Sequence, residues 1–228
     1  YSYFGFGWFH PSILQVSGSA DSNLYYPEVN FWQDYGLFNR IKKRLVDRYR
    51  LWGVKKSKAV VYENEALMRR GRLLYDLPQV VLIKPSIMVD PESDFYSLPS
   101  CIPSQSSKIL LLCGWHLNKN VMIVPELAAL LKDRENIFHF IITAPMDNSR
   151  LQVDFMDKVK KYKVETYVTV TGQVEKKYLK SLYEQIDFVL LLSKLESFRN
   201  NIIEHWQYRK PLVVASQESS KAISKDAA

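Results

Sequence analysis

Hydrophobic residues from position 108 onward fall into short apolar runs that alternate with segments of helical spacing. Strands are predicted at the apolar runs 108–113 (KILLLC), 137–143 (IFHFIIT), 167–171 (YVTVT), 188–192 and 212–215. Helices are predicted between them, at 121–131, 151–162, 176–185 and 200–208. Such alternation is typical of parallel sheets, so we predict a doubly wound α/β domain here.

The residues before position 108 follow a different pattern. They predict a basic amphipathic helix at about 37–49, a strand at 59–62, a helix at 65–74 and a strand at 80–83. A stretch rich in Pro, Ser and Asp at 85–107 predicts a linker. We therefore expect a first domain at 1–87, a linker at 88–107 and a second domain at 108–228. The chain begins with Tyr1 rather than Met, so we expect it to start within a longer protein.

Composition narrows the class of protein. Hydrophobic residues make up 47% and charged residues 24% of the chain, which is typical of a soluble globular protein. The sequence has no apolar run of about 18 residues and no targeting signal, so we expect a cytoplasmic protein. Cys101 and Cys113 do not suggest a disulfide framework. No group of His, Cys, Asp and Glu has metal-ligand spacing, so we predict no metal.

Positive charge is concentrated at 36–72, where 12 Lys and Arg face three acidic residues. Two interpretations of the helix at 37–49 stay open. Its Lys and Arg side chains form an ordinary solvated face while its apolar stripe packs on the sheet, or the helix lies against an anionic membrane surface. The apolar stripe comprises Phe38, Ile41, Leu45, Val46 and Tyr49. A nucleic acid is a weaker candidate partner, because no recognised motif supports one.

The segment after the fourth predicted strand of the second domain carries the strongest candidate chemistry. Glu196 lies in the loop and Glu204 lies in the helix that follows, at the edge where open α/β sheets bind ligands. A carboxylate at such a helix can accept hydrogen bonds from the two hydroxyls of a ribose. The free backbone amides near Arg199, Asn200 and Asn201 can bind phosphate. The alternative is that Glu196 is a surface acid and Glu204 an acid of the first helical turn.

Several motifs resemble, in order, those of family-four glycosyltransferases of the GT-B fold. Glu196 and Glu204 form an E-x₇-E pair, and Lys210-Pro211 and an apolar strand follow it. Gly114-Trp115-His116-Leu117-Asn118-Lys119-Asn120 resembles the phosphate-binding loop of that family. Thr171-Gly172-Gln173-Val174 resembles its nucleobase-side segment. The matches extend over roughly 120 residues, so the resemblance implies a Rossmann-like donor domain preceded by part of an acceptor domain, with the chain truncated at both ends.

The resemblance also implies roles for individual residues. Lys119 and Gly114 would contact the donor diphosphate, Glu204 the ribose, Val174 the nucleobase side and Glu196 the transferred sugar. This chain departs from the family pattern at Trp115, where the family often has Arg, and Arg199 would compensate. His205 stands where Ala is usual, and we interpret it as a packing residue. We interpret His139, inside a predicted strand, as a satisfied core residue.

The expected activity is therefore metal-independent transfer of a hexose, with retention, from a nucleoside-diphosphate sugar. The expected acceptor is a glycan or a lipid-linked glycan in cell-surface polysaccharide synthesis, with no cofactor and no nucleic-acid partner. Peripheral attachment to the inner face of the cell membrane is a further expectation. The alternatives are a non-catalytic protein that binds nucleotide sugars and a basic module that binds nucleic acid.

Overall fold

The computed structural model describes residues 13–77, 79–84, 94–134, 137–195, 200–216, 218 and 220–221. They form two compact units, each with its own parallel sheet. Unit 1 takes its described residues from 1–86, 195–199 and 216–227, and unit 2 takes them from 87–194 and 200–215. The chain therefore passes from one unit to the other more than once.

Unit 2 contains a five-stranded sheet in the order β6-β5-β4-β7-β8, with all neighbouring strands parallel. Its strands are β4 (Ser107–Leu111), β5 (Phe138–Ile142), β6 (Val168–Val170), β7 (Phe188–Leu191) and β8 (Leu212–Val214). Its helices are η2 (Leu117–Lys119), η3 (Val121–Ile123), α3 (Val124–Leu131), α4 (Arg150–Tyr162), η4 (Lys176–Tyr178), α5 (Leu179–Glu184) and α6 (Asn200–Gln207). The predicted doubly wound α/β fold is confirmed.

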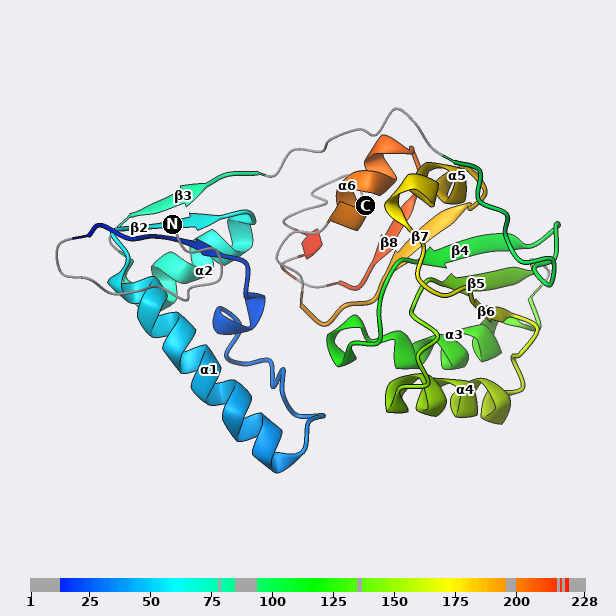
Figure 1. Cartoon of the computed structure of the whole chain (residues 1–228), viewed down its shortest axis with the longest axis horizontal. Helices are drawn as coiled ribbons and strands as arrows, with labels where there is room; N and C mark the ends of the chain where they lie inside the picture. The colour runs from blue at the N-terminus through cyan, green and yellow to red at the C-terminus, as the bar shows by residue number, and fades with distance from the viewer. Residues whose placement is uncertain are drawn as a thin grey trace. The chain divides into compact units, whose positions relative to one another are not determined.

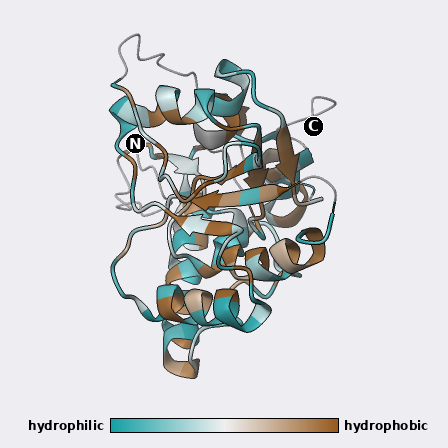
Figure 2. Ribbon diagram, turned by 90° about the vertical axis from the view of Figure 1, so that its right-hand side faces the viewer, coloured by the Kyte–Doolittle hydropathy of each residue, from teal (hydrophilic) through white to brown (hydrophobic). Residues whose placement is uncertain are grey.

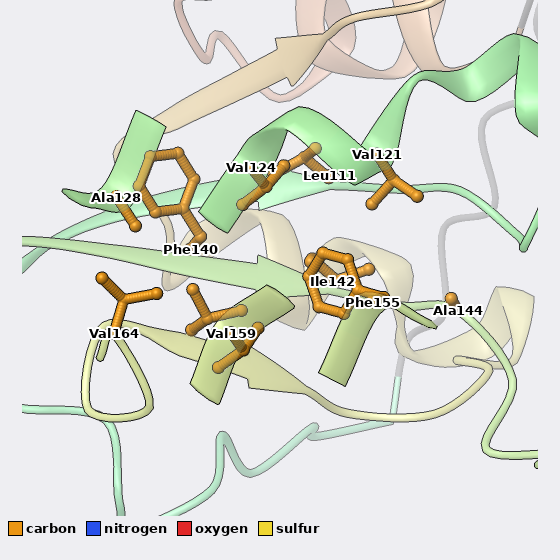
Figure 3. Close-up of a cluster of buried hydrophobic side chains, with 11 residues drawn as sticks. Leu111, Val121, Val124, Ala128, Phe140, Ile142, Ala144, Phe155, Val159 and Val164 are labelled. Carbon is orange, nitrogen blue, oxygen red and sulfur yellow. The ribbon is translucent and has the colours of Figure 1, made fainter. Parts of the chain in front are cut away.

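Helices cover both faces of this sheet, with α3 and α4 on one face and α5 and α6 on the other (Figure 1). Most strand residues of this sheet are hydrophobic (Figure 2). This composition is expected for a parallel sheet, because helices exclude water from both of its faces. On the first face, Phe140 and Ile142 of β5 pack with Val124 of α3 and with Phe155 and Val159 of α4 (Figure 3). This buried layer fixes the strand ends from which the candidate site is built.

The order of the strands reverses beside β4. From β4 the chain proceeds to β5 and β6 on one side, then crosses back to β7 and β8 on the other side. Ile109 of β4 pairs with Phe140 on one side and with Phe188 on the other. Open α/β sheets bind ligands at the carboxyl ends of the strands where such a reversal occurs.

Part of the predicted linker is packed on unit 2. The backbone N–H of Tyr96 donates to Ser181 Oγ at 3.0 Å, and Gln185 Nε2 donates to the Tyr96 carbonyl at 2.6 Å. The side chain of Ile102 is buried as well. Residues 94–106 therefore form an ordered edge of unit 2, and residues 85–93 lie outside the described part of the chain.

Unit 1 contains a three-stranded parallel sheet in the order β1-β2-β3. Its elements are β1 (Val16–Ser19), η1 (Ser22–Leu24), α1 (Leu37–Lys56), β2 (Ala59–Tyr62), α2 (Glu65–Tyr75) and β3 (Val80–Leu82). The sequence pattern did not predict β1, because Ser17, Gly18 and Ser19 have low strand propensity. Pairing with β2 buries this strand, and Ser17 Oγ lies 2.6 Å from Ser57 Oγ, so the buried hydroxyl is satisfied.

Helix α1 differs from its prediction in length and in orientation. It continues to Lys56 instead of ending at 49, and it is anchored near its end by the buried Val54. Phe38, Ile41 and Leu45 are 81%, 52% and 57% exposed, so the predicted apolar stripe does not pack on the sheet. The interpretation of the stripe as a core-facing surface is therefore wrong.

Candidate functional site

A hollow of about 450 Å³ lies in unit 2 at the carboxyl edge of its sheet. Residues that follow three neighbouring strands, β4, β5 and β6, form much of its wall, and α5 and α6 complete it. The lining residues are Leu112, Cys113, Gly114, Thr143, Pro145, Gln173, Val174, Lys176, Leu179 and Glu204. Its position beside the strand reversal is the one that the fold predicts for a ligand.

Glu204 contributes a carboxylate to this hollow from helix α6. Tyr183 of α5 donates a hydrogen bond from its hydroxyl to Glu204 Oε2 at 3.1 Å. The Tyr183 ring is fully buried and stacks on Tyr208 at a centroid distance of 4.8 Å. The carboxylate is therefore held by a side chain that has little freedom to move.

Burial and the nearby charges act on Glu204 in opposite directions. Burial raises its pKa above the ordinary value, while the hydrogen bond from Tyr183 and the charge of Lys176 lower it in part. The pKa of Tyr183 is raised by burial and by the charge of Glu204, so the phenol keeps its proton and acts as the donor. A ligand that supplies further hydrogen-bond donors would favour the ionised carboxylate.

Lys176 is a residue of the hollow that the sequence analysis missed. It begins helix η4, and its charge lowers the pKa of Glu204. Lys176 follows the segment Thr171-Gly172-Gln173-Val174 that resembles the nucleobase side of the family site. The closeness of Lys176 to this segment in the sequence was the signal that could have identified it as a site residue. It adds a cation to the lining of the hollow.

Packing within the protein does not require a glycine at position 114, so the absence of a side chain there leaves space in the hollow. A Cβ built on Gly114 would have one near neighbour, His116 Cδ2, at 3.9 Å, which is an ordinary contact. The open backbone therefore fits close approach of a ligand to the loop after β4.

Trp115, at the position where the family often has Arg, has a structural role. Its Nε1 donates to the carbonyl of Pro145, and its ring lies 5.4 Å from that of Phe155. It therefore ties the loop after β4 to the loop after β5, and both loops line the hollow. The indole supplies no charge for a phosphate.

The structure brings together part of the site that was predicted from sequence. Gly114, Val174 and Glu204 all line the hollow. Lys119 ends η2 with 5% of its surface exposed and is not among the lining residues. Glu196 and Arg199 lie outside the described residues. Helix α6 begins at Asn200, directly followed by Asn201, and the side chains of these two residues are also outside the description.

Among the residues that the structure describes, no histidine lines the hollow, and His205 and His139 have partners elsewhere in unit 2. His205 is buried, and its Nδ1–H donates to the Lys210 carbonyl at 2.9 Å; burial lowers its pKa, so it stays neutral. His139 is buried in β5 beside the Thr169 hydroxyl, at 2.8 Å. Neither cysteine forms a disulfide. Across the described ranges no three His, Cys, Asp or Glu residues are grouped to hold a metal.

Comparison with protein families decides the class of this chain. The model of the family "Glycosyl transferases group 1" matches residues 107–227, which is more than half of the sequence. The chain belongs to this glycosyltransferase family. The match covers every strand of the five-stranded sheet and every residue of the hollow. The search of curated protein sequences gave no match.

Solved structures of glycosyltransferases share this fold. Sucrose-phosphate synthase from Thermosynechococcus elongatus aligns with a TM-score of 0.64 and 15% identity, over 88% of this chain and 50% of that one. WaaG, a glycosyltransferase involved in lipopolysaccharide biosynthesis, aligns with a TM-score of 0.62 and 17% identity, over 90% and 57%. HepE from Anabaena, solved with UDP and glucose, aligns with a TM-score of 0.59 and 14% identity, over 91% and 54%. This member of the glycosyltransferase family thus has a GT-B-like fold, and the chain spans about half the length of these structures.

One negative finding concerns membranes. Among the helices in the described ranges, none is long and apolar enough to span a bilayer.

Proposed function

We propose that this chain forms part of a retaining, metal-independent glycosyltransferase that uses a nucleoside-diphosphate sugar. The transferred sugar is a hexose, and the acceptor is a glycan or lipid-linked glycan in cell-surface polysaccharide synthesis at the inner face of the cell membrane. No cofactor takes part. The observation that carries the proposal is the hollow at the strand reversal, where Glu204, Lys176 and the open Gly114 backbone converge.

The chemistry of the hollow supports a nucleotide as its ligand. The Glu204 carboxylate suits the paired hydroxyls of a ribose, and Lys176 suits an anionic group. The solved structure of HepE with UDP and glucose and that of pneumococcal GtfA with UDP and GlcNAc support the nucleoside diphosphate. In this arrangement the nucleobase lies toward Gln173 and Val174.

The protein's main contribution to such a transfer is electrostatic. The departing diphosphate gains negative charge in the transition state, and prealigned cations and backbone amides stabilise that charge. The leaving phosphate oxygen accepts the acceptor's proton on the face where the sugar is attacked, so retention needs no separate protein base. We propose that Lys119, Arg199 and the amides near Asn200 and Asn201 contact the diphosphate, and that Glu196 contacts the sugar.

Calorimetric titration with UDP, GDP and ADP tests this proposal. Glu204→Ala should weaken the preferred nucleotide by about ten- to a hundredfold, because a charge-assisted hydrogen bond contributes about 1.5–3 kcal/mol. Glu184→Ala is the matched control, since Glu184 is an exposed acid of the same unit outside the hollow. Equal affinity of wild type and Glu204→Ala would remove the ribose role, and absence of binding by all three nucleotides would remove donor recognition.

A non-catalytic protein that binds nucleotide sugars is the second candidate function. The position of Trp115 favours it, because the indole packs on Phe155 and leaves the loop after β4 without the usual Arg. Release of labelled sugar from the donor by the full-length protein would exclude this alternative. Tight donor binding with neither transfer nor hydrolysis would support it.

A further inference from the structure

Helix α1 presents an exposed face made of large apolar side chains. Their exposed fractions run from 42% to 81%, although residues of these types are mostly buried in folded proteins. They recur at spacings of three and four, so they lie on one side of the helix. We call this surface the exposed α1 face; it comprises Leu37, Phe38, Ile41, Leu45, Tyr49 and Trp52.

Basic residues border this apolar surface. Lys42, Arg44 and Arg48 are exposed, and each lies three or four positions from a residue of the exposed α1 face. Over its 20 residues α1 carries eight Lys and Arg against one acid, Asp47, which is a net charge of +7. The net charge of the entire chain is also +7. The helix therefore carries a local positive potential together with its apolar side chains.

The opposite side of α1 attaches the helix to unit 1 in a defined orientation. Arg50 forms an ion pair with Asp21 at 3.1 Å, and Lys43 lies over the Trp32 ring at 4.5 Å from its centroid. Val54 is fully buried. The outward direction of the exposed α1 face is thus fixed by contacts within unit 1.

A small hollow on the other side of α1 carries further cations, and it reaches the border of the exposed α1 face at Lys42. It has a volume of about 290 Å³, and Lys42, Lys43 and Arg50 line it with Trp32, Asn39, Val46 and Asp47. Asp47 accepts a hydrogen bond from Trp32 Nε1 at 2.5 Å, so this acid is engaged within the protein. Lys42 belongs both to this hollow and to the border of the exposed α1 face.

We propose that the exposed α1 face docks on an anionic lipid bilayer. The apolar side chains enter the boundary between headgroups and acyl chains, while Lys42, Arg44 and Arg48 bind lipid phosphates. This inference rests on the proposed function and names the surface that brings the enzyme to a lipid-linked acceptor. A second copy of the chain does not fit this surface, because two helices of charge +7 repel each other. Nucleic acid would leave the apolar side chains exposed to water.

Flotation of the full chain with vesicles tests the proposal. Binding is expected to phosphatidylcholine vesicles that contain roughly one third phosphatidylglycerol, and to weaken as salt is raised. Phe38→Ser with Leu45→Ser should reduce binding at least about tenfold, and so should Lys42→Gln with Arg44→Gln and Arg48→Gln. All five side chains are solvent-exposed, so the unfolding transition should change little.

Matched substitutions on α4 of unit 2 serve as controls. Val153→Ser with Met156→Ser removes two exposed apolar side chains there, and Lys160→Gln with Lys161→Gln and Lys163→Asn removes three exposed charges at its end. Both controls should bind vesicles as well as the wild type does. Equal losses in the α1 and α4 variants would contradict docking through α1.

Other outcomes separate the alternative partners. Binding that is equal with and without phosphatidylglycerol, or absent from all vesicles, overturns the proposal. If vesicle binding is absent, a salt-resistant complex with duplex DNA would assign the surface to nucleic acid. A dimer that dissociates in the variant Phe38→Ser with Leu45→Ser would assign it to a second copy of the chain. Either result overturns the proposal. Nucleotide titration of the same samples tests the enzyme function separately. Nucleotide binding without vesicle binding rejects only the membrane surface, and vesicle binding without nucleotide binding rejects only the transferase.

Discussion

The carboxylate of Glu204 is held in place by the protein, and a ligand could donate further hydrogen bonds to it. The carboxylate accepts from Tyr183 Oη at 3.1 Å and lies near Lys176, but burial still raises its pKa. Ionisation of Glu204 in the hollow is therefore less favourable than in water. The two ribose hydroxyls of the proposed nucleotide would supply further donors to this half-buried carboxylate, so ligand binding and ionisation of Glu204 should be coupled.

Tyr183→Phe tests this coupling. The change keeps the ring that stacks on Tyr208 but removes the hydrogen bond that lowers the pKa of Glu204. The pKa of Glu204 should therefore rise further, and nucleotide affinity should fall off at a higher pH than in the wild type as the solution is acidified. Affinity at neutral pH should decrease less than in Glu204→Ala. Calorimetry over a pH series measures both effects.

Tyr167→Phe is the control for this pH profile. It removes another phenol in unit 2, one that donates to the Lys132 carbonyl at 3.4 Å and does not line the hollow. Its affinity profile should match that of the wild type. If Tyr183→Phe left the acid limb of the profile in place, Tyr183 would have only a packing role.

Single residues of the site could be predicted from sequence only where a motif marked them. Gly114, Val174 and Glu204 belong to recognisable segments, and all three line the hollow. Tyr183 falls within the helix predicted at 176–185, but nothing in the sequence indicated its contact with Glu204. Its contact with Glu204 depends on how α5 packs against α6, which local sequence does not encode.

At the scale of elements, α2 shows how closely helix and sheet pack in unit 1. Gly71 lies in the middle of this helix, and a Cβ built there would be 2.1 Å from the hydroxyl of Tyr62. Tyr62 itself is fully buried against Tyr25, with ring centroids 5.3 Å apart. The phenol cannot move aside without disturbing the core.

Gly71→Ala should therefore destabilise the protein, although alanine is the better helix former by about 1 kcal/mol. The clash should reduce the free energy of unfolding by about 1–3 kcal/mol, measured by urea denaturation. Gly36→Ala is the control, because nothing lies within 4 Å of its added Cβ. A Gly71→Ala protein as stable as the wild type would show that Tyr62 has space to shift.

Hydrophobic periodicity predicted the strands of unit 2 closely, because buried parallel strands form unbroken apolar runs. It failed for β1, whose Ser and Gly residues are buried by pairing with β2 and by hydroxyl contacts. It also failed for the direction of α1. Amphipathic spacing shows that a helix has an apolar side, but only the contacts of Arg50 and Val54 show that this side faces outward.

On the scale of the whole molecule, ion pairs in unit 1 join distant parts of the chain. Glu218 accepts from Arg70 Nε at 2.8 Å and from Arg69 at 2.9 Å, across a separation of 148 residues in the first case. Arg70 also pairs with Glu28 at 2.7 Å. Partial burial would raise the pKa of Glu218, but the hydrogen bonds from the two arginines outweigh it and hold that pKa below the ordinary value.

Glu218→Gln should reduce the free energy of unfolding by up to about 1 kcal/mol at neutral pH, since the pair is partly exposed. A carboxyl with a lowered folded pKa stabilises above its ordinary pKa, and this contribution is lost as pH falls through the folded value. The difference in stability between the two proteins should therefore shrink as the pH is lowered through the folded pKa of Glu218. Urea denaturation at neutral pH and over a series of acidic pH values measures this difference.

Glu126→Gln is the control for that comparison. It breaks an exposed pair with Lys158 at 3.3 Å in unit 2, where the two residues are much closer in the sequence. Its effect should be close to zero. A loss in Glu218→Gln that stayed the same in acid would have to arise from something other than the ion pairs.

The path of the chain between the units has a consequence for biosynthesis. The core of unit 1 includes Leu195, which packs with Tyr25, Val60 and Leu67. This core therefore combines residues that are synthesised early with one that is synthesised more than 100 residues later. During translation, unit 1 cannot close its core until most of unit 2 has left the ribosome. Until then the segments of unit 1 that are already synthesised lack their complete core, and the apolar residues of β2 stay accessible to chaperones. The order of folding therefore differs from the order of synthesis.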